Sequence, residues 1–120
     1  MYSRVYRSKS PKDKRNEYSR AYRVKNPYYA YKVGALHRGV AFTLMKEEVE
    51  EMVKRACRYC GTLPEEGKRN GIDRVDNDKG YEEENCVPCC WRCNDMKSYL
   101  SVAEFVSHCE LVVNHNKREE

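Results

Sequence analysis

The sequence predicts a small α+β fold that needs a staple besides its hydrophobic core, preceded by a basic, helical extension at the N-terminus. Three observations lead to this expectation. Segments with helical and strand-like apolar spacing alternate along the chain, the mean hydropathy is only −0.96, and seven cysteines are present. A chain of 120 residues with 35% charged side chains can bury only a limited core, so a disulfide or metal staple is expected.

The charge is divided unevenly along the chain. Residues 1–46 contain twelve Lys and Arg residues against two acidic ones, a net charge of +10, whereas residues 47–120 carry eleven against seventeen, a net charge of −6. The basic part is also rich in tyrosine, which suits a polyanion whose bases or sugars can meet aromatic faces. We therefore predict a nucleic-acid-binding extension at residues 1–39, with a solvated tail as the alternative. Binding through such an extension would depend strongly on salt. The side chains predicted to contact nucleic acid here are Arg20, Arg23, Lys32 and Arg38.

The elements of the basic part follow from helix-breaking residues. Residues 1–13 are expected to form a flexible arm, and residues 14–25 a helix that Pro27 ends, because the residue before a proline avoids helical angles. A second short helix is expected at residues 28–39, and residues 40–43 alternate like a short strand or an extended link.

The clearest helical pattern covers residues 44–56, for which Thr43 is the expected N-cap. One stripe of apolar residues has the spacing of a buried helix face. It consists of Met45, Val49, Met52, Val53 and Ala56.

Beyond Cys57 the sequence predicts a hairpin followed by two helices. Residues 72–75 alternate as a half-exposed strand does, and the turn cluster at 76–80 returns the chain towards Cys86. Residues 91–99 are compatible with a short helix. The last helix begins with a capping box of Ser101 and Glu104. Its expected buried stripe consists of Val102, Phe105, Val106, Cys109 and Val113.

The cysteines favour a metal staple over disulfides. The start of the sequence has no apolar segment typical of a secretory signal, and no stretch approaches the length of a membrane span. We therefore expect the chain inside the cell, in the cytoplasm or in the nucleus or virus factory of a host, and neither secreted nor bound to a membrane. In a reducing compartment paired thiols bind metal more often than they form bridges, and seven is an odd number.

Two pairs of cysteines have the spacing of zinc ligands. Cys57 and Cys60 form a CxxC pair followed by a glycine that can turn sharply. The second pair is a choice between Cys86-Val-Pro-Cys89 and Cys90-Trp-Arg-Cys93. The proline removes one amide donor from the first choice, whereas the second runs directly into a helix. We therefore predict a closed, structural zinc site. Its four ligands are Cys57, Cys60, Cys90 and Cys93, and the small buried residues that remain are Cys86, Cys89 and Cys109.

The segment CRYCG…GIDRVDNDKGY…ENCVPCCWRCNDMK resembles the HNH endonucleases of the ββα-metal (His-Me finger) type, in particular small phage- or virus-type members with two zinc knuckles. The resemblance covers roughly residues 36–110 and implies an HNH-like ββα-metal domain at residues 40–120. It implies that Asp73 and Asn94 hold a catalytic divalent cation, magnesium or manganese, against a DNA phosphate. It further implies that Asn85 braces the hairpin loop and that Lys97 lies near the phosphate backbone.

One position departs from the family pattern. Where the family has Asp-His, this sequence has Asp73-Arg74. The histidine is the general base of the family, and arginine stays protonated. Three interpretations remain. In the first, Arg74 binds the nucleic-acid phosphate and stabilises the transition state, while metal-bound water, Asp76 or a histidine elsewhere supplies the base. In the second, the protein cleaves slowly. In the third, it binds DNA without cutting it.

The sequence as a whole thus predicts a metal-dependent endonuclease or nickase that acts on duplex or branched DNA. The alternatives are a non-cleaving, zinc-containing nucleic-acid-binding protein, as part of a larger assembly, and a zinc knuckle that binds only protein. The three histidines, His37, His108 and His115, are expected to lie on the surface or to pack against helices rather than to bind metal. The sequence does not predict an oligomeric state.

Overall fold

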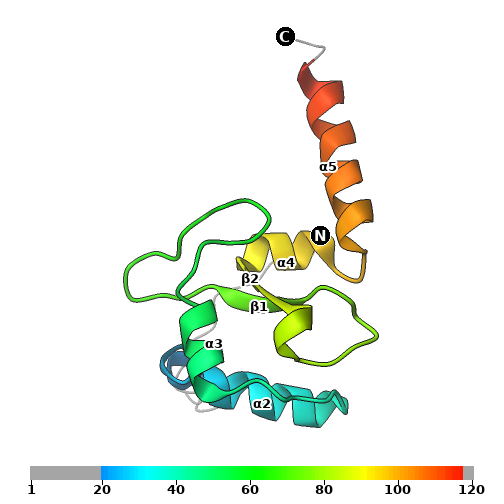
Figure 1. Cartoon of the computed structure of the whole chain (residues 1–120). Helices are drawn as coiled ribbons and strands as arrows, with labels where there is room; N and C mark the ends of the chain where they lie inside the picture. The colour runs from blue at the N-terminus through cyan, green and yellow to red at the C-terminus, as the bar shows by residue number, and fades with distance from the viewer. Residues whose placement is uncertain (1–19, 118–120) are drawn as a thin grey trace, which may run out of the picture.

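The computed structural model describes residues 20–117 of the chain. A β-hairpin lies between two helices on one side and a third on the other, and a fourth helix projects away from the rest (Figure 1). This arrangement confirms the predicted α+β class. The elements are α2 (Pro27–Arg38), α3 (Lys46–Met52), β1 (Gly71–Arg74), the short 3₁₀ helix η1 (Glu83–Asn85), β2 (Cys86–Cys89), α4 (Trp91–Lys97) and α5 (Val102–Lys117).

The hairpin formed by β1 and β2 lies between the two cysteine pairs in the sequence and is hydrogen-bonded to the first pair. Strands β1 and β2 are antiparallel, with Asp73 opposite Val87 in the register. The predicted strand at residues 72–75 is confirmed, one residue earlier than expected. Strand β2 tolerates Pro88 because each strand of a two-stranded sheet is an edge strand. The carbonyl of Pro88 accepts a hydrogen bond of 2.8 Å from the amide of Arg58, so the first cysteine pair is tied to the strand.

The helices before the hairpin are separated where the sequence predicts. Residues 20–25 are helical and Asn26 is not, so Pro27 begins a new helix instead of extending the first. Helix α2 ends at Gly39, whose φ of 67° places it in the left-handed region that glycine adopts at low cost. The rest of the helix predicted at residues 14–25, and the arm predicted at residues 1–13, lie outside the described residues.

Helix α3 is shorter than the predicted helix at residues 44–56, and its N-cap is Met45 instead of Thr43. The amide of Met45 donates a hydrogen bond of 2.7 Å to the Glu48 carboxylate, which turns back over the helix start. Thr43 does not cap the helix because both its amide, at 2.9 Å, and its side-chain hydroxyl, at 3.4 Å, donate to the carbonyl of Tyr81. The prediction of Thr43 was therefore wrong, for a reason that lies in a distant segment.

This later start also changes which residues are buried. Leu44, just before the helix, is buried, whereas Met45 is 62% exposed and does not belong to the predicted stripe. The strand expected at residues 40–43 is reduced to one isolated parallel bridge between Phe42 and Tyr81.

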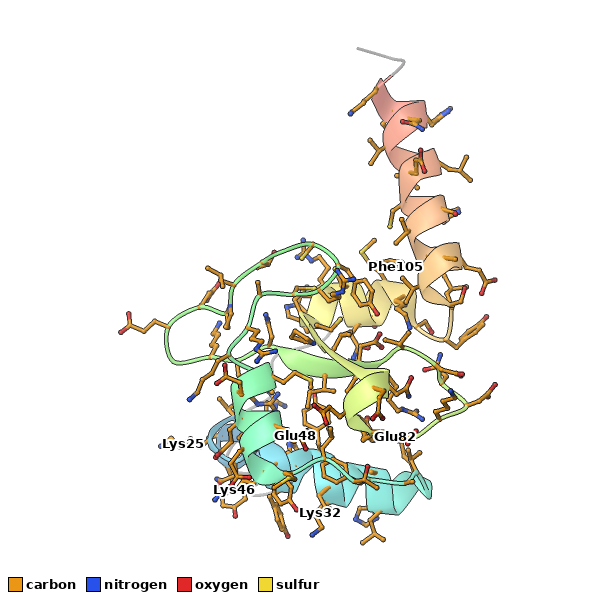
Figure 2. The ribbon with its side chains drawn as sticks, in the orientation of Figure 1. Lys25, Lys32, Lys46, Glu48, Glu82 and Phe105 are labelled. Atoms are coloured by element: carbon orange, nitrogen blue, oxygen red, sulfur yellow. The ribbon has the colours of Figure 1, made fainter. Side chains whose placement is uncertain are left out.

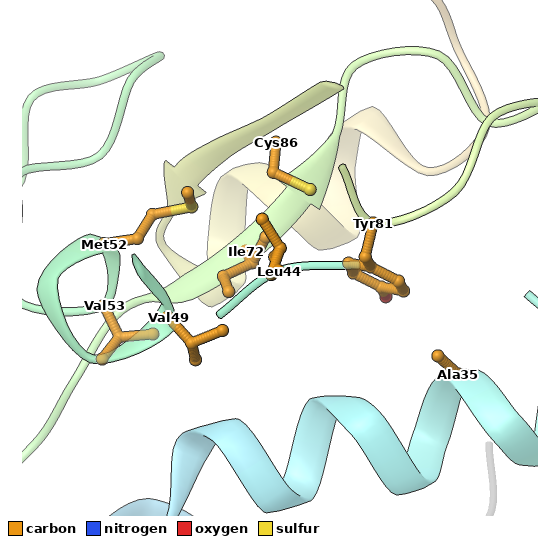
Figure 3. Close-up of a cluster of buried hydrophobic side chains, with 8 residues drawn as sticks. All are labelled: Ala35, Leu44, Val49, Met52, Val53, Ile72, Tyr81 and Cys86. Atoms are coloured by element: carbon orange, nitrogen blue, oxygen red, sulfur yellow. The ribbon is translucent and has the colours of Figure 1, made fainter. Parts of the chain in front are cut away.

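The main core lies between α2, α3 and the hairpin, where the labelled side chains of Figure 3 converge. It contains Ala35 of α2 together with Ile72 of β1. Part of the predicted basic extension, residues 1–39, therefore packs in the same core as the hairpin. Its buried members are Ala35, Leu44, Val49, Met52, Val53, Ile72, Tyr81 and Cys86.

A second, smaller core surrounds the cysteine pairs on the other side of the hairpin. Phe105, in the first turn of α5, supplies its aromatic member and lies at the base of that helix in Figure 2. The predicted capping box is confirmed, because Ser101 and Glu104 exchange two hydrogen bonds of 3.1 Å. The predicted stripe is buried only at Phe105. Val106 and Val113 are 50% and 46% exposed, because α5 projects beyond the second core.

Among residues 20–117, no helix combines the length and the apolar character that crossing a membrane requires.

Candidate metal centre and phosphate site

The two cysteine pairs converge at one point between the hairpin and α4. The sulfur atoms of Cys57, Cys60, Cys90 and Cys93 all lie within 4.8 Å of one another. A tetrahedral zinc ion with Zn–S bonds of about 2.3 Å separates its sulfurs by roughly 3.8 Å. The Cys60 and Cys90 sulfurs are 3.7 Å apart, so the cluster fits zinc. The predicted grouping of these four residues, with Cys86 and Cys89 left out, agrees with this geometry.

Local backbone geometry explains how each pair presents its sulfurs. Gly61 adopts a φ of 79°, which lets the chain turn back after Cys60, and its amide bonds to the Cys57 carbonyl at 2.9 Å. At the second pair, Cys90 is the N-cap of α4 and its sulfur accepts a hydrogen bond of 3.4 Å from the Cys93 amide. Both sulfurs of this pair are therefore presented from the start of one helix to the same cluster.

The electrostatics of the cluster favour at least one thiolate. Burial raises the pKa of Cys57, but backbone hydrogen bonds at Cys60 and Cys90 outweigh it and lower the pKa to about 6. Burial raises the pKa of Cys93, which a zinc ion would have to overcome. The remaining cysteines pack as apolar residues: Cys86 lies in the main core, and Cys89 and Cys109 lie in or against the second one.

A polar cavity of about 330 Å³ opens between α2, the hairpin and α4. Asp73 of β1 and Asn94 of α4 both line it, as the resemblance implies. Side chains alternate along a strand, so Ile72 points into the main core while Asp73 points to the side of α4. Three arginines also line this cavity, namely Arg38, Arg69 and Arg74.

Asp73 is almost completely buried, with 4% of its surface exposed. Its Oδ2 atom accepts a hydrogen bond of 2.6 Å from the Tyr59 hydroxyl and lies 3.3 Å from the Lys97 ammonium nitrogen. Burial, and next the hydrogen bond to Asp73, raise the pKa of Tyr59 far above its usual value, so the phenol stays protonated and donates. The Asp73 carboxylate is therefore held from two sides.

Lys97 does not lie where the resemblance implies. Its side chain is completely buried, and its ammonium group pairs with Asp73 instead of facing a phosphate backbone. A buried ammonium group requires a partner of opposite charge, and Asp73 provides it. The role of Lys97 in this structure is thus internal to the site.

Arg74 occupies the position of the missing histidine and is held firmly. Its Nη1 atom donates to the carbonyls of Asn77 at 3.1 Å and Lys79 at 2.9 Å, and the guanidinium lies over the Tyr81 ring at 5.3 Å. Arg38 reaches the same tyrosine from α2 and donates to its hydroxyl at 2.9 Å. Tyr81 therefore brings two guanidinium groups from different elements to the cavity.

Asn85 is buried and braces the loop between the strands. Its side-chain oxygen accepts from the Asp76 amide at 2.9 Å, and its amide nitrogen donates to the carbonyls of Asp76 at 3.0 Å and Gly80 at 2.9 Å. These are the backbone hydrogen bonds that the resemblance implies for this residue. The loop whose carbonyls hold Arg74 is thereby fixed.

The basic residues predicted in the N-terminal extension differ in their positions. Arg20, Arg23 and Lys32 are exposed and do not line the cavity, whereas Arg38 does. Lys32 lies over the ring of Tyr28, with its nitrogen 5.4 Å from the ring centroid. Of this group, the structure brings only Arg38 into the site.

Several residues of the site were not predicted from the sequence. Tyr59 stands between the cysteines of the first pair, and Arg69 lies in a loop. No local pattern shows that Tyr59 contacts Asp73 or that Arg69 lines the cavity. Tyr31 lines the cavity from α2 and accepts a hydrogen bond of 2.9 Å from the Ile72 amide. Only the spacing of Tyr31 and Arg38 on one helix could have suggested a shared face.

The candidate general bases are also placed. Among the residues that line the cavity there is no histidine, and His37 and His108 are exposed. Asp76 is exposed on the loop and accepts a hydrogen bond of 2.9 Å from the Asp78 amide, the turn chemistry typical of such a cluster.

The chain is similar to one curated protein and to one solved structure. No family model matches the chain. Uncharacterized protein R423 of Acanthamoeba polyphaga mimivirus is 41% identical over 90 residues, which cover 75% of this chain, but the chain spans only 17% of that protein's length. The solved structure of the rare-cutting HNH restriction endonuclease PacI matches with a TM-score of 0.58 at 24% identity, covering 73% of this chain and 75% of that one. This likeness shows an HNH-like fold.

Proposed function

We propose that the chain is a metal-dependent DNA endonuclease or nickase of the HNH type, which hydrolyses phosphodiester bonds. One observation carries the proposal: Asp73 and Asn94 line the same cavity as three arginines. A carboxylate and an amide oxygen are ligands for a hard cation, and guanidinium groups bind phosphate. The HNH-like fold and the fit of the four cysteines to a structural zinc support it.

The residues of the cavity have distinct roles in this proposal. Asp73 and Asn94 would hold one magnesium or manganese ion, which supplies charge neutralisation at the phosphate and at the leaving 3′ oxygen. Asn85 braces the loop on which this geometry depends. The zinc site has four thiolates and no open position, so its role is structural.

Arg74 is the proposed stabiliser of the transition state. As the oxygen of water bonds to phosphorus and the bond to the 3′ oxygen breaks, negative charge accumulates on the non-bridging oxygens. The Arg74 guanidinium is already oriented by the Asn77 and Lys79 carbonyls, so it need not reorganise at that moment. The proton of the attacking water leaves to solvent, because neither an imidazole nor Asp76 is among the residues that line the cavity. We therefore expect slow cleavage.

A second candidate function is a nucleic-acid-binding protein that does not cleave. The observation that favours it is the same missing base: Arg74 replaces the histidine, and the histidines at positions 37 and 108 are exposed away from the cavity. In this case the arginines grip phosphates and Asp73 serves only as the counter-ion of Lys97.

Plasmid nicking with magnesium or manganese distinguishes the two candidates. The native chain is compared with Asp73→Ala and Asn94→Ala, and the matched controls are Asp95→Ala, on the exposed side of α4, and Asn116→Ala, near the end of α5. We expect both site variants to lose at least about 100-fold in rate, equivalent to about 2.7 kcal/mol of transition-state stabilisation, and both controls to nick like the native chain.

The outcomes are separate. Cleavage that both site variants retain would eliminate this site. Binding to DNA without cleavage under either metal would favour the second candidate. No affinity for DNA at low salt would leave the protein-binding zinc knuckle.

The DNA substrate and the location also belong to the proposal. We propose duplex or branched DNA as the substrate, with a backbone phosphate at the arginines of the cavity. We place the chain inside the cell, in the cytoplasm or in the nucleus or virus factory of a host. The seven free cysteines and the zinc-compatible cluster support this, because thiolate sites persist in reducing compartments.

A further inference from the structure

Tyr59 connects the cysteine cluster to the cavity. It stands between Cys57 and Cys60, and its hydroxyl donates to Oδ2 of Asp73 at 2.6 Å. The ring packs edge-on against Phe105, with the centroids 5.7 Å apart. Cys57 and Cys60, which flank Tyr59 along the chain, both belong to the four-cysteine cluster. The position of the Tyr59 hydroxyl therefore follows from the geometry of that cluster.

Lys97 reaches the same oxygen atom from the opposite side. Its ammonium nitrogen lies 3.3 Å from Oδ2 of Asp73, and within residues 20–117 it makes no hydrogen bond of good geometry. The pair is therefore an ionic contact without an aligned hydrogen bond. Among residues 20–117, the Tyr59 hydroxyl donates the one aligned hydrogen bond to the Asp73 side chain, so it sets how the carboxylate plane is turned, while Lys97 adds the opposite charge.

The two contacts leave the other oxygen to the cavity. Within the described residues, both contacts of the Asp73 side chain end on Oδ2. A carboxylate held by one oxygen presents the other in a fixed direction, which suits a cation bound through a single oxygen. Groups that hydrogen-bond a metal ligand from behind orient it, and removing one typically lowers metal affinity about 10- to 100-fold.

We propose that Tyr59 is a positioning residue that turns the Asp73 carboxylate so that Oδ1 faces the divalent cation, which makes the cation site depend on the cysteine knuckle. This inference rests on the proposed function, since it takes Asp73 as a cation ligand. It adds a residue that touches neither DNA nor cation and acts through its hydroxyl alone.

Tyr59→Phe tests the inference because it removes only the hydroxyl and keeps the ring against Phe105. The zinc-loaded full-length chain is titrated with Mn²⁺ by calorimetry, and nicking is measured against Mn²⁺ concentration. We expect the Mn²⁺ dissociation constant and the concentration for half-maximal nicking to rise about tenfold, with a smaller change in rate at saturating Mn²⁺. Tyr99→Phe, on a side chain 82% exposed, is the matched control and should behave like the native chain.

Zinc content is measured on each variant. The inference is overturned if Tyr59→Phe binds Mn²⁺ as tightly as the native chain, and also if it loses zinc, because the hydroxyl is assigned no part in holding the cysteines. A native chain that binds Mn²⁺ through Asp73 but never nicks DNA would contradict the proposed function and leave the role of Tyr59 standing. Native Mn²⁺ binding that Asp73→Ala does not weaken would overturn both.

Discussion

Replacing Asn85 by alanine should destabilise the fold more than any other single polar truncation in the hairpin loop. The side chain is buried and makes three hydrogen bonds to the backbone of that loop. At a net contribution of about 0.5–1.5 kcal/mol each, their loss lowers the free energy of unfolding by about 1.5–4.5 kcal/mol. Domains of this size are stable by roughly 5–15 kcal/mol, so the change is a large fraction of the total.

Urea unfolding of the zinc-loaded chain, followed by circular dichroism, measures this effect. The matched control is Asn116→Ala, which removes one hydrogen bond of 2.7 Å on the exposed surface of α5 and should change stability by less than about 0.5 kcal/mol. A loss below about 1 kcal/mol for Asn85→Ala would refute the reasoning, since it would mean that the loop backbone finds equally good partners in water. Nicking should fall as well, because the same loop supplies the carbonyls that orient Arg74.

Two further predictions concern the zinc site and the glycine at position 80. Cys60→Ser, or chelation of the native chain, should abolish cooperative unfolding, because a structural zinc contributes about 10 kcal/mol or more. The control, Cys109→Ser, should keep one zinc per chain by metal analysis and should unfold like the native protein. Gly80→Ala should destabilise by about 1–3 kcal/mol, because its Cβ would lie 2.6 Å from the Ala41 carbonyl oxygen, a backbone atom fixed by its hydrogen bond to Tyr81. Gly34→Ala in α2 meets only the flexible end of Arg38 and should instead stabilise by up to about 1 kcal/mol; thermal unfolding that showed equal effects at the two glycines would contradict the packing argument.

The parts of the fold that sequence predicts well are those set by local chemistry. Pro27 and Gly39 delimit α2, Ser101 and Glu104 cap α5, and the CxxC spacing defines the four-cysteine cluster. Each depends on residues within a few positions of one another. The start of α3 was missed because Thr43 bonds to Tyr81, which lies far along the chain.

The exposure of α5 shows that burial, too, depends on distant parts of the chain. Apolar spacing indicates which face of a helix could be buried, but not whether anything covers it. In α5, Phe105 is the buried member of the second core and Cys109 packs against it one turn later, whereas Val113 is 46% exposed. The stripe is present in the sequence, and its burial depends on the length of the neighbouring elements.

The candidate site was predicted in part, and the missing part is the support of the key residues. Sequence motifs indicate Asp73 and Asn94 because they lie beside recognisable patterns. They do not indicate Tyr59 or the burial of Lys97, because these contacts join segments that only the folded chain brings together. A lysine near a predicted phosphate site is normally expected on the surface, and its burial here follows from the charge of Asp73.

Helix α4 shows why the two sites belong to one structure. It has only seven residues, and isolated helices of this length are not stable in water. Its first turn is held where Cys90 and Cys93 meet the other pair, and its last residue, Lys97, is buried against Asp73. Asn94 lies between these two anchors, so its direction is set by the cluster at one end and by the ion pair at the other. Loosening either anchor should therefore turn Asn94 away from the cavity.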